Sequence, residues 1–194
     1  NSPACNGSGL FYWQMNKGIV IIFSLINTVI TAQTSYFNNR YDILNHDGSV
    51  CIVTTNDGYL CGGVADLTND WRIALMLLDT MGNPIWKKTY GKTGLQYWAG
   101  NVGSLVKTYD GGYALGGGQD YVPGNSDGTL WKFNQNGDSL WMKTFGDSTQ
   151  YFEAFYQCKQ TPDSGFILIG ATDEPSAGGN TDIWLLKTDK DGNF

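Results

Sequence analysis

Histidine is nearly absent from this sequence, since His46 is the only one in 194 residues. Catalytic triads of the Ser/His/Asp type, Cys/His pairs and histidine-rich metal centres all depend on imidazole groups. A single histidine cannot supply a histidine cluster, and no serine or cysteine nucleophile is marked beside it. We therefore expect no metal centre, no cofactor and none of these catalytic sites.

Basic charge is also scarce. Lysine and arginine number 12 against 18 aspartates and glutamates, which gives a net charge of −6 and a pI near 4.5. An acidic surface repels phosphate backbones and lacks the basic footprint of nucleic-acid-binding proteins. We expect neither a nucleic-acid partner nor an anionic membrane surface.

No apolar run is long enough to cross a bilayer, which takes about 20 residues. The longest, residues 18–30, follows Met15 and Lys17 and is succeeded by Thr31-Ala32-Gln33. This order is typical of a secretory signal peptide over residues 15–32. We expect a secreted or cell-surface protein with no membrane span in the mature chain. Residues 1–14 precede the initiator Met15, and we interpret them as non-native upstream translation.

Cysteine is limited to four residues, and without Cys5 an odd number remains. Cys51 and Cys61 flank the turn at residues 56–58, so a disulfide between them is one interpretation. The other is core packing, because equivalent positions of the repeat described next alternate between cysteine and leucine, and free cysteine behaves as a small buried hydrophobe. We favour core packing.

Glycine (26 residues) and aromatic residues (14%) are plentiful, and they recur in a pattern. The segment DGGYALGGGQD at 110–120 matches NDGYLCGGVAD at 56–66 and DSGFILIGATD at 163–173. A second segment, WKKTYG at 86–91, returns as WMKTFG at 141–146. Trp98 beside Tyr97 aligns with Phe152 beside Tyr151 in the same way. Self-similarity at a fixed period near 50 is typical of propellers, solenoids and arrays.

The second copy carries four strand signals separated by glycine turns, at 103–110, 113–117, 129–134 and 139–146, and the third copy lacks the fourth of them. One such sheet cannot bury both of its faces, so copies must pack against one another. The sequence predicts an all-β fold, an incomplete β-propeller of about three four-stranded antiparallel blades with repeats of about 54 residues. We place the partial propeller at 33–194, with blades at about 48–101, 102–154 and 155–194. The lead-in at 35–43 is predicted to lean on the first blade.

The segments DGGYALGG, IWLLKTDKDGN and WMKTFG resemble repeats of secreted, kelch-like β-propeller proteins of Bacteroidota. Proteins of this kind often carry a type nine secretion sorting domain. The resemblance covers about residues 35–194 and implies a secreted or cell-surface protein. Three periods are fewer than the four blades of the smallest closed propeller, so we expect a fragment of a longer protein.

Asp66, Asp120 and Asp173 recur directly after the second strand of each copy. In a ring they would face one end and could bind a cation or a polar ligand. The alternative, which we favour, is that each aspartate begins a loop by accepting bonds from nearby backbone amides. Residues 189–193 (DKDGN) lack the spacing of a calcium loop and are predicted to form a hairpin turn.

The composition and repeat favour a non-enzymatic module that binds a protein or glycan ligand at the propeller rim. The alternative is the N-terminal part of a secreted propeller hydrolase or lyase that acts on polysaccharide through carboxylates in its channel. No carboxylate pair is marked by the sequence alone, and the sequence does not identify a ligand.

Overall fold

The computed structural model describes residues 36–44, 46–68, 70–122, 125–147, 151–174 and 180–194, together with two short strands nearer the N-terminus. It divides the chain into two units, residues 1–34 and residues 35–194. In the first unit, β1 (Trp13–Gln14) pairs antiparallel with β2 (Ile19–Val20). The rest of the predicted upstream stretch and signal peptide lies outside the described residues.

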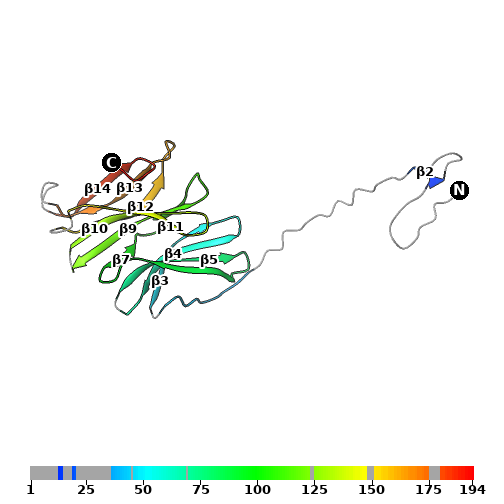
Figure 1. The fold of residues 1–194 in the computed structure, drawn as a ribbon, viewed down its shortest axis with the longest axis horizontal. Helices are drawn as coiled ribbons and strands as arrows, with labels where there is room; N and C mark the ends of the chain where they lie inside the picture. The colour runs from blue at the N-terminus through cyan, green and yellow to red at the C-terminus, as the bar shows by residue number, and fades with distance from the viewer. Residues whose placement is uncertain are drawn as a thin grey trace. The chain divides into compact units, whose positions relative to one another are not determined.

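The second unit is all-β, and its described residues contain no helix (Figure 1). They form three antiparallel sheets. The first sheet has the order β3 (Asp47–Thr54), β4 (Gly58–Asp66), β5 (Trp71–Asp79), β6 (Pro84–Tyr90). The second has the order β11 (Ser139–Phe145), β10 (Asn125–Phe133), β9 (Tyr113–Val122), β7 (Gln96–Ala99), and β8 (Leu105–Lys107) also pairs with β9. The third has the order β12 (Glu153–Gln160), β13 (Phe166–Thr172), β14 (Asp182–Thr188). The predicted all-β class is confirmed.

The second sheet has five strands because its first strand is broken in two. We predicted a single run over residues 103–110, but β7 and β8 both pair with β9. Between them the backbone N–H of Asn101 donates to the carbonyl of Tyr156 in β12 at 2.8 Å, so the break connects this sheet to the next. β7 precedes the predicted blade boundary at 101/102 and nevertheless belongs to the second sheet.

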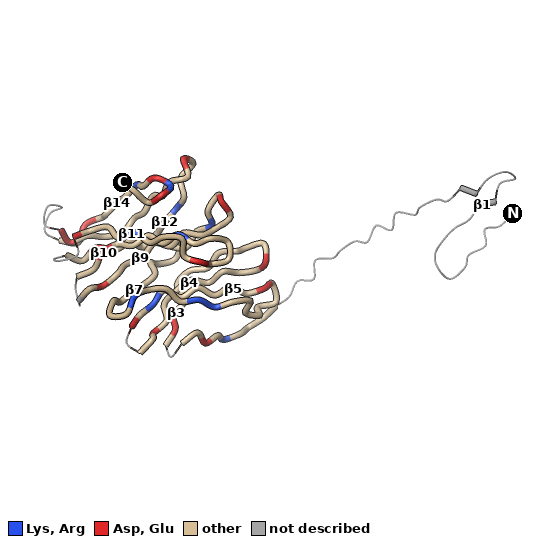
Figure 2. Tube along the Cα trace, viewed as in Figure 1, with Lys and Arg blue, Asp and Glu red and all other residues tan. Residues whose placement is uncertain are grey.

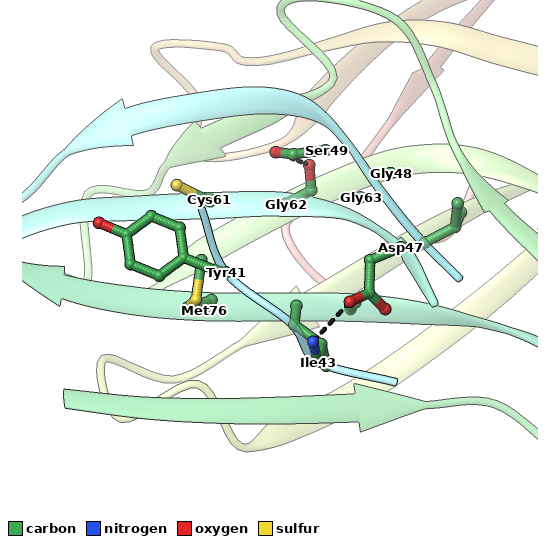
Figure 3. Close-up of a pocket in the computed structure, with 11 residues that line it drawn as sticks. Tyr41, Ile43, Asp47, Gly48, Ser49, Cys61, Gly62, Gly63 and Met76 are labelled. Atoms are coloured by element: carbon green, nitrogen blue, oxygen red, sulfur yellow. Dashed lines mark hydrogen bonds between the residues drawn. The ribbon is translucent and has the colours of Figure 1, made fainter. Parts of the chain in front are cut away.

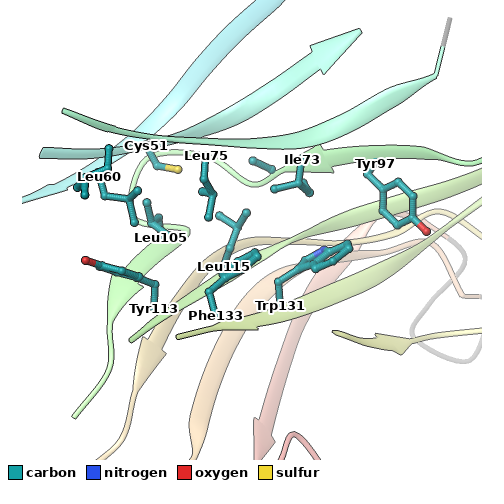
Figure 4. Close-up of a cluster of buried hydrophobic side chains, with 12 residues drawn as sticks. Cys51, Leu60, Ile73, Leu75, Tyr97, Leu105, Tyr113, Leu115, Trp131 and Phe133 are labelled. Atoms are coloured by element: carbon teal, nitrogen blue, oxygen red, sulfur yellow. The ribbon is translucent and has the colours of Figure 1, made fainter. Parts of the chain in front are cut away.

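Two hydrophobic cores join the sheets face to face. The first lies between the first and second sheets, where Leu60, Ile73 and Leu75 oppose Leu115 and Trp131 (Figure 4). The second lies between the second and third sheets and is formed by Ala114, Leu130, Phe145, Phe155, Cys158, Phe166, Leu168 and Leu186. Each large side chain buried in this way contributes about 1.5–3 kcal/mol to stability. The middle sheet is therefore apolar on both faces.

Two of the three described cysteines lie in the hydrophobic cores. Cys51 and Cys158 are buried free thiols within the first and second cores. Cys61 is also free and lies on the other face of the first sheet, beside Tyr41 and Met76 (Figure 3). The absence of a Cys51–Cys61 disulfide agrees with the preference, and core packing is observed for Cys51 but not for Cys61.

The turn that follows the third strand is the same in all three copies. In the third, the carboxylate of Asp189 accepts the backbone N–H groups of Asp191 and Asn193 at 2.9 and 2.8 Å. The hydrogen bonds from Asn193 lower the pKa of Asp189. The hairpin interpretation of residues 189–193 is confirmed, since this carboxylate binds its own turn.

Each of these turns is covered by an aromatic side chain. A Cβ added at Gly137 would lie 2.4 Å from the Trp86 ring of the first sheet, and one at Gly192 would lie 3.0 Å from Trp141 of the second. Gly82 has the same backbone geometry, with φ of 82° against 80° at Gly137 and 78° at Gly192. These contacts repeat the same sheet-to-sheet relation along the chain.

The lead-in segment supplies the corresponding contact for the first sheet. The ring of Phe37 lies over Gly82, and the Tyr41 hydroxyl donates to the carbonyl of Gly82 at 2.6 Å. Tyr90, four residues after Trp86, donates in the same way to Gly137. The predicted leaning of this segment on the first sheet is therefore observed, and it reproduces the contacts of a fourth strand.

Acidic residues gather at turns and strand ends, as Figure 2 shows. No helix among the described residues is long and apolar enough to cross a membrane.

Candidate functional site

Asp66 ends β4, Asp120 lies inside β9 near its end, and Asp173 directly follows β13; each of the three is half-buried. The Asp66 carboxylate lies 3.7 Å from Nδ1 of His46, and Asp66 N–H donates to the His46 carbonyl at 2.8 Å. Asp173 repeats the backbone bond, donating to the carbonyl of Phe152 at 3.0 Å. Asp66 and Asp173 therefore each link the end of the second strand to the residue that precedes the first strand of the same sheet.

The other two carboxylates bind within their own sheets as well. Asp173 Oδ1 accepts the backbone N–H of Phe152 at 2.6 Å, and Asp120 Oδ1 accepts the indole N–H of Trp98 at 3.1 Å. Burial raises the pKa of Asp120, although the bond from Trp98 opposes the rise. Trp98 in turn stacks on Phe152 at 6.3 Å between ring centres. Neither carboxylate contact is with a backbone amide of the loop that follows the aspartate, so the loop-starting interpretation stays a prediction.

A different pair of carboxylates meets between the second and third sheets. Asp127 in β10 is 3% exposed and Glu153 in β12 is 5% exposed. Both converge on Gly146, where an added Cβ would lie 2.1 Å from Glu153 Oε2 and 3.0 Å from Asp127 Oδ1. The structure thus forms a buried acidic pair that the sequence did not mark.

Within the described part of the chain, three of the four carboxylate oxygens of this pair accept hydrogen bonds, and the fourth does not. Glu153 Oε2 accepts the backbone N–H of Asp147 at 2.7 Å, and Glu153 Oε1 accepts the Thr172 hydroxyl at 3.3 Å. Asp127 Oδ2 accepts the Tyr121 hydroxyl at 2.9 Å. Among the described residues, buried Asp127 Oδ1 makes no hydrogen bond.

The neighbouring charges that shift the pKa values of Asp127 and Glu153 are all negative. Burial is the main cause that raises the pKa of Asp127, and the negative charge of Asp147 adds to it. Burial likewise raises the pKa of Glu153, with Asp127 and Glu174 adding to the rise. Burying two like charges together is unfavourable unless a proton or a cation neutralises them.

The equivalent place between the first and second sheets is occupied differently. Arg72, 55 positions before Asp127, pairs with Ala65 of β4 as Asp127 pairs with Gln119 of β9. A Cβ at Gly91 would lie 2.7 Å from the Tyr97 ring and 2.9 Å from Arg72 Cδ. The position that holds Asp127 in one interface thus holds a guanidinium in the other.

A small apolar hollow lies on the outer face of the first sheet (Figure 3). It has a volume of about 140 Å³ and is walled by Tyr41 and Ile43 of the lead-in and by Cys61 and Met76 of the sheet. Asp47 holds the lead-in here by accepting the N–H of Ile43 at 2.5 Å. The hollow is a packing gap beneath the lead-in and offers few polar groups.

A larger hollow of about 350 Å³ lies among turns of the first and second sheets, at the strand ends opposite those of Asp66 and Asp120. Its lining is polar and is contributed by Thr55, Asn56, Asp57, Lys107, Gly111, Tyr113, Gln135 and Asn136. Side-chain amides with one carboxylate and one ammonium can donate to and accept from hydroxyl and peptide groups. Sequence reasoning missed this hollow because its lining comes from turns that are distant along the chain.

No protein-family model and no curated protein matches this chain. Among the described residues, no group of three or more histidine, cysteine, aspartate or glutamate side chains could hold a metal ion. The three predicted aspartates are therefore not gathered into one such group.

Proposed function

We propose that residues 35–194 form consecutive blades of a secreted or cell-surface β-propeller of the kelch-like Bacteroidota kind. The repeated aromatic contact on the turns at Gly82, Gly137 and Gly192 supports this architecture. Phe37 and Tyr41 stand where Trp86 and Tyr90 stand one sheet later, which suits a lead-in that serves as the fourth strand of a neighbouring blade.

The module binds a polar ligand, a glycan or a protein segment, and does not catalyse a reaction. The observation that carries this function is the polar hollow, because Asn56, Gln135 and Asn136 present amide groups together with Asp57 and Lys107. Such groups hydrogen-bond the hydroxyls of a sugar without any nucleophile or general base. Asp66, Asp120 and Asp173 form a second candidate rim at the opposite strand ends.

The buried pair of Asp127 and Glu153 is the feature that favours the alternative hydrolase or lyase, since such enzymes use paired carboxylates. The pair is nevertheless 3% and 5% exposed, so a polysaccharide cannot reach it. This burial favours the binding function over catalysis.

Glycan-array binding of the purified chain tests the proposal, with Asn136→Ala altering the hollow and Asp120→Asn altering the opposite rim. We expect glycan binding that Asn136→Ala weakens at least tenfold and Asp120→Asn leaves unchanged. The reverse result would move the site to the aspartate rim. Release of reducing sugar from a polysaccharide by the wild-type chain would establish the enzymatic alternative.

A further inference from the structure

We propose that the interface between the second and third sheets binds a divalent cation, calcium by its chemistry, on the carboxylates of Asp127 and Glu153. This site is independent of the ligand-binding hollow and concerns how neighbouring sheets are held together.

The first support is the unpartnered oxygen. Asp127 is 3% exposed, yet its Oδ1 makes no hydrogen bond among the described residues. A buried carboxylate oxygen without a partner is costly unless it binds something. This oxygen and Glu153 Oε2 lie 3.0 and 2.1 Å from the point where a Cβ on Gly146 would fall, so both carboxylates face the same place.

The second support is the first interface, where the buried charge at this position has a partner of opposite sign. There Arg72, 9% exposed, brings a guanidinium whose Nη2 lies 3.2 Å from Asp70. The second interface places two carboxylates at the corresponding position, with acidic neighbours in Asp147 and Glu174. A bound cation would balance the two carboxylates as Asp70 balances Arg72 one sheet earlier.

Ligand chemistry selects calcium. Calcium accepts six to eight oxygen ligands in flexible geometry, including bidentate carboxylates and water, whereas magnesium requires a stricter octahedron. Asp127 and Glu153 contribute a charge of −2 that a divalent ion balances, and the Thr172 hydroxyl is an additional neutral oxygen beside Glu153. Two carboxylates correspond to the weak sites of extracellular modules, with dissociation constants of about 0.1–1 mM.

Thermal unfolding of the full chain at pH 8 tests the site, with EDTA, 5 mM calcium chloride or 5 mM magnesium chloride. We expect calcium to raise the melting temperature of the wild type by about 3–6 °C, and magnesium to raise it far less. Asp127→Asn should weaken calcium binding, so that the half-saturating calcium concentration rises at least tenfold. The same variant should melt higher than the wild type in EDTA, because it removes one of two buried like charges.

Glu153→Gln provides a second variant with the same expected loss of the calcium response. Asp163→Asn is the matched control: its carboxylate lies in the same pair of sheets, in the exposed turn before β13, and it should keep the full response. Terbium luminescence excited through Tyr121, whose hydroxyl lies 2.9 Å from Asp127 Oδ2, reports binding directly. Equal melting temperatures of the wild type in calcium and EDTA, or an unchanged response in Asp127→Asn, would overturn the proposal in favour of a proton-neutralised pair.

Discussion

At the scale of single residues, Gly111 and Gly137 have the same left-handed backbone in different surroundings. Their φ angles are 81° and 80°, which favour glycine. A Cβ at Gly111 would meet nothing within 4 Å, whereas one at Gly137 would meet the Trp86 ring at 2.4 Å. The two positions therefore separate backbone strain from contact between sheets.

We predict that Gly111→Ala lowers the free energy of unfolding by about 1 kcal/mol through backbone strain alone. Gly137→Ala should cost about 1–3 kcal/mol more, because Trp86 must move away from the first core. Urea denaturation measures both. Equal losses in the two variants would show that the contact between Trp86 and the turn contributes nothing.

At the scale of elements, the packing of β12 against β10 across the second interface makes stability depend on pH. Asp127 and Glu153 have folded-state pKa values raised above those of about 3.9 and 4.3 in an unfolded chain, chiefly by burial. Between the unfolded and the raised values the folded state binds more protons than the unfolded state. Stability contributed by the protonated carboxyls is therefore present at low pH and is lost as the pH rises through this range.

We accordingly predict that, in EDTA, the stability contributed by this interface falls as the pH is raised from 4 to 8. The melting temperature of the wild type should therefore fall relative to that of Asp127→Asn. Asp127→Asn should flatten that fall, since it removes one of the two titrating groups. Melting curves recorded at intervals of one pH unit provide the measurement. A wild-type profile identical in shape to that of Asp127→Asn would contradict the assignment.

At the scale of the whole molecule, the third sheet presents an apolar face on the side away from the second core. Ile169, Ile183 and Leu185 are 42%, 82% and 62% exposed, and Ile169 pairs directly with Leu185 in the sheet register. Exposed apolar patches of this kind mark surfaces that pack against another protein surface. In the proposed propeller, a further blade packs here.

We predict that the isolated chain self-associates through this face. Ile183→Glu should lower the weight-average mass measured by sedimentation equilibrium, because it places a charge within the patch. Val102→Glu, at a loop residue that is 78% exposed, is the control and should leave the mass unchanged. A monomeric wild type at tens of micromolar concentration would show that the face does not drive association.

Most strands, the repeated turn and many core positions of this protein were predictable from its sequence, because each depends on a local pattern that the copies repeat. The division of one strand into β7 and β8 was not predicted. Tyr113 and Phe166 lie in equivalent cores, Gly82, Gly137 and Gly192 share one turn, and Leu105 and Cys158 lie at matching register positions, opposite Leu115 and Leu168. Comparing the copies identifies such features because it aligns residues that occupy equivalent positions of the repeat.

Only the tertiary structure revealed the carboxylate pair, because an interface joins unlike positions of two different copies. Aligning the copies by sequence matches Tyr97 with Tyr151, whereas the strand register makes Glu153 its counterpart: Tyr97 lies opposite Gln119, and Glu153 lies opposite Thr172. That slip, and the packing of β12 against β10, bring Glu153 beside Asp127. Whether a buried charge is neutralised depends on the residue across the interface. That residue belongs to a neighbouring copy, so the sequence of a single copy does not reveal it.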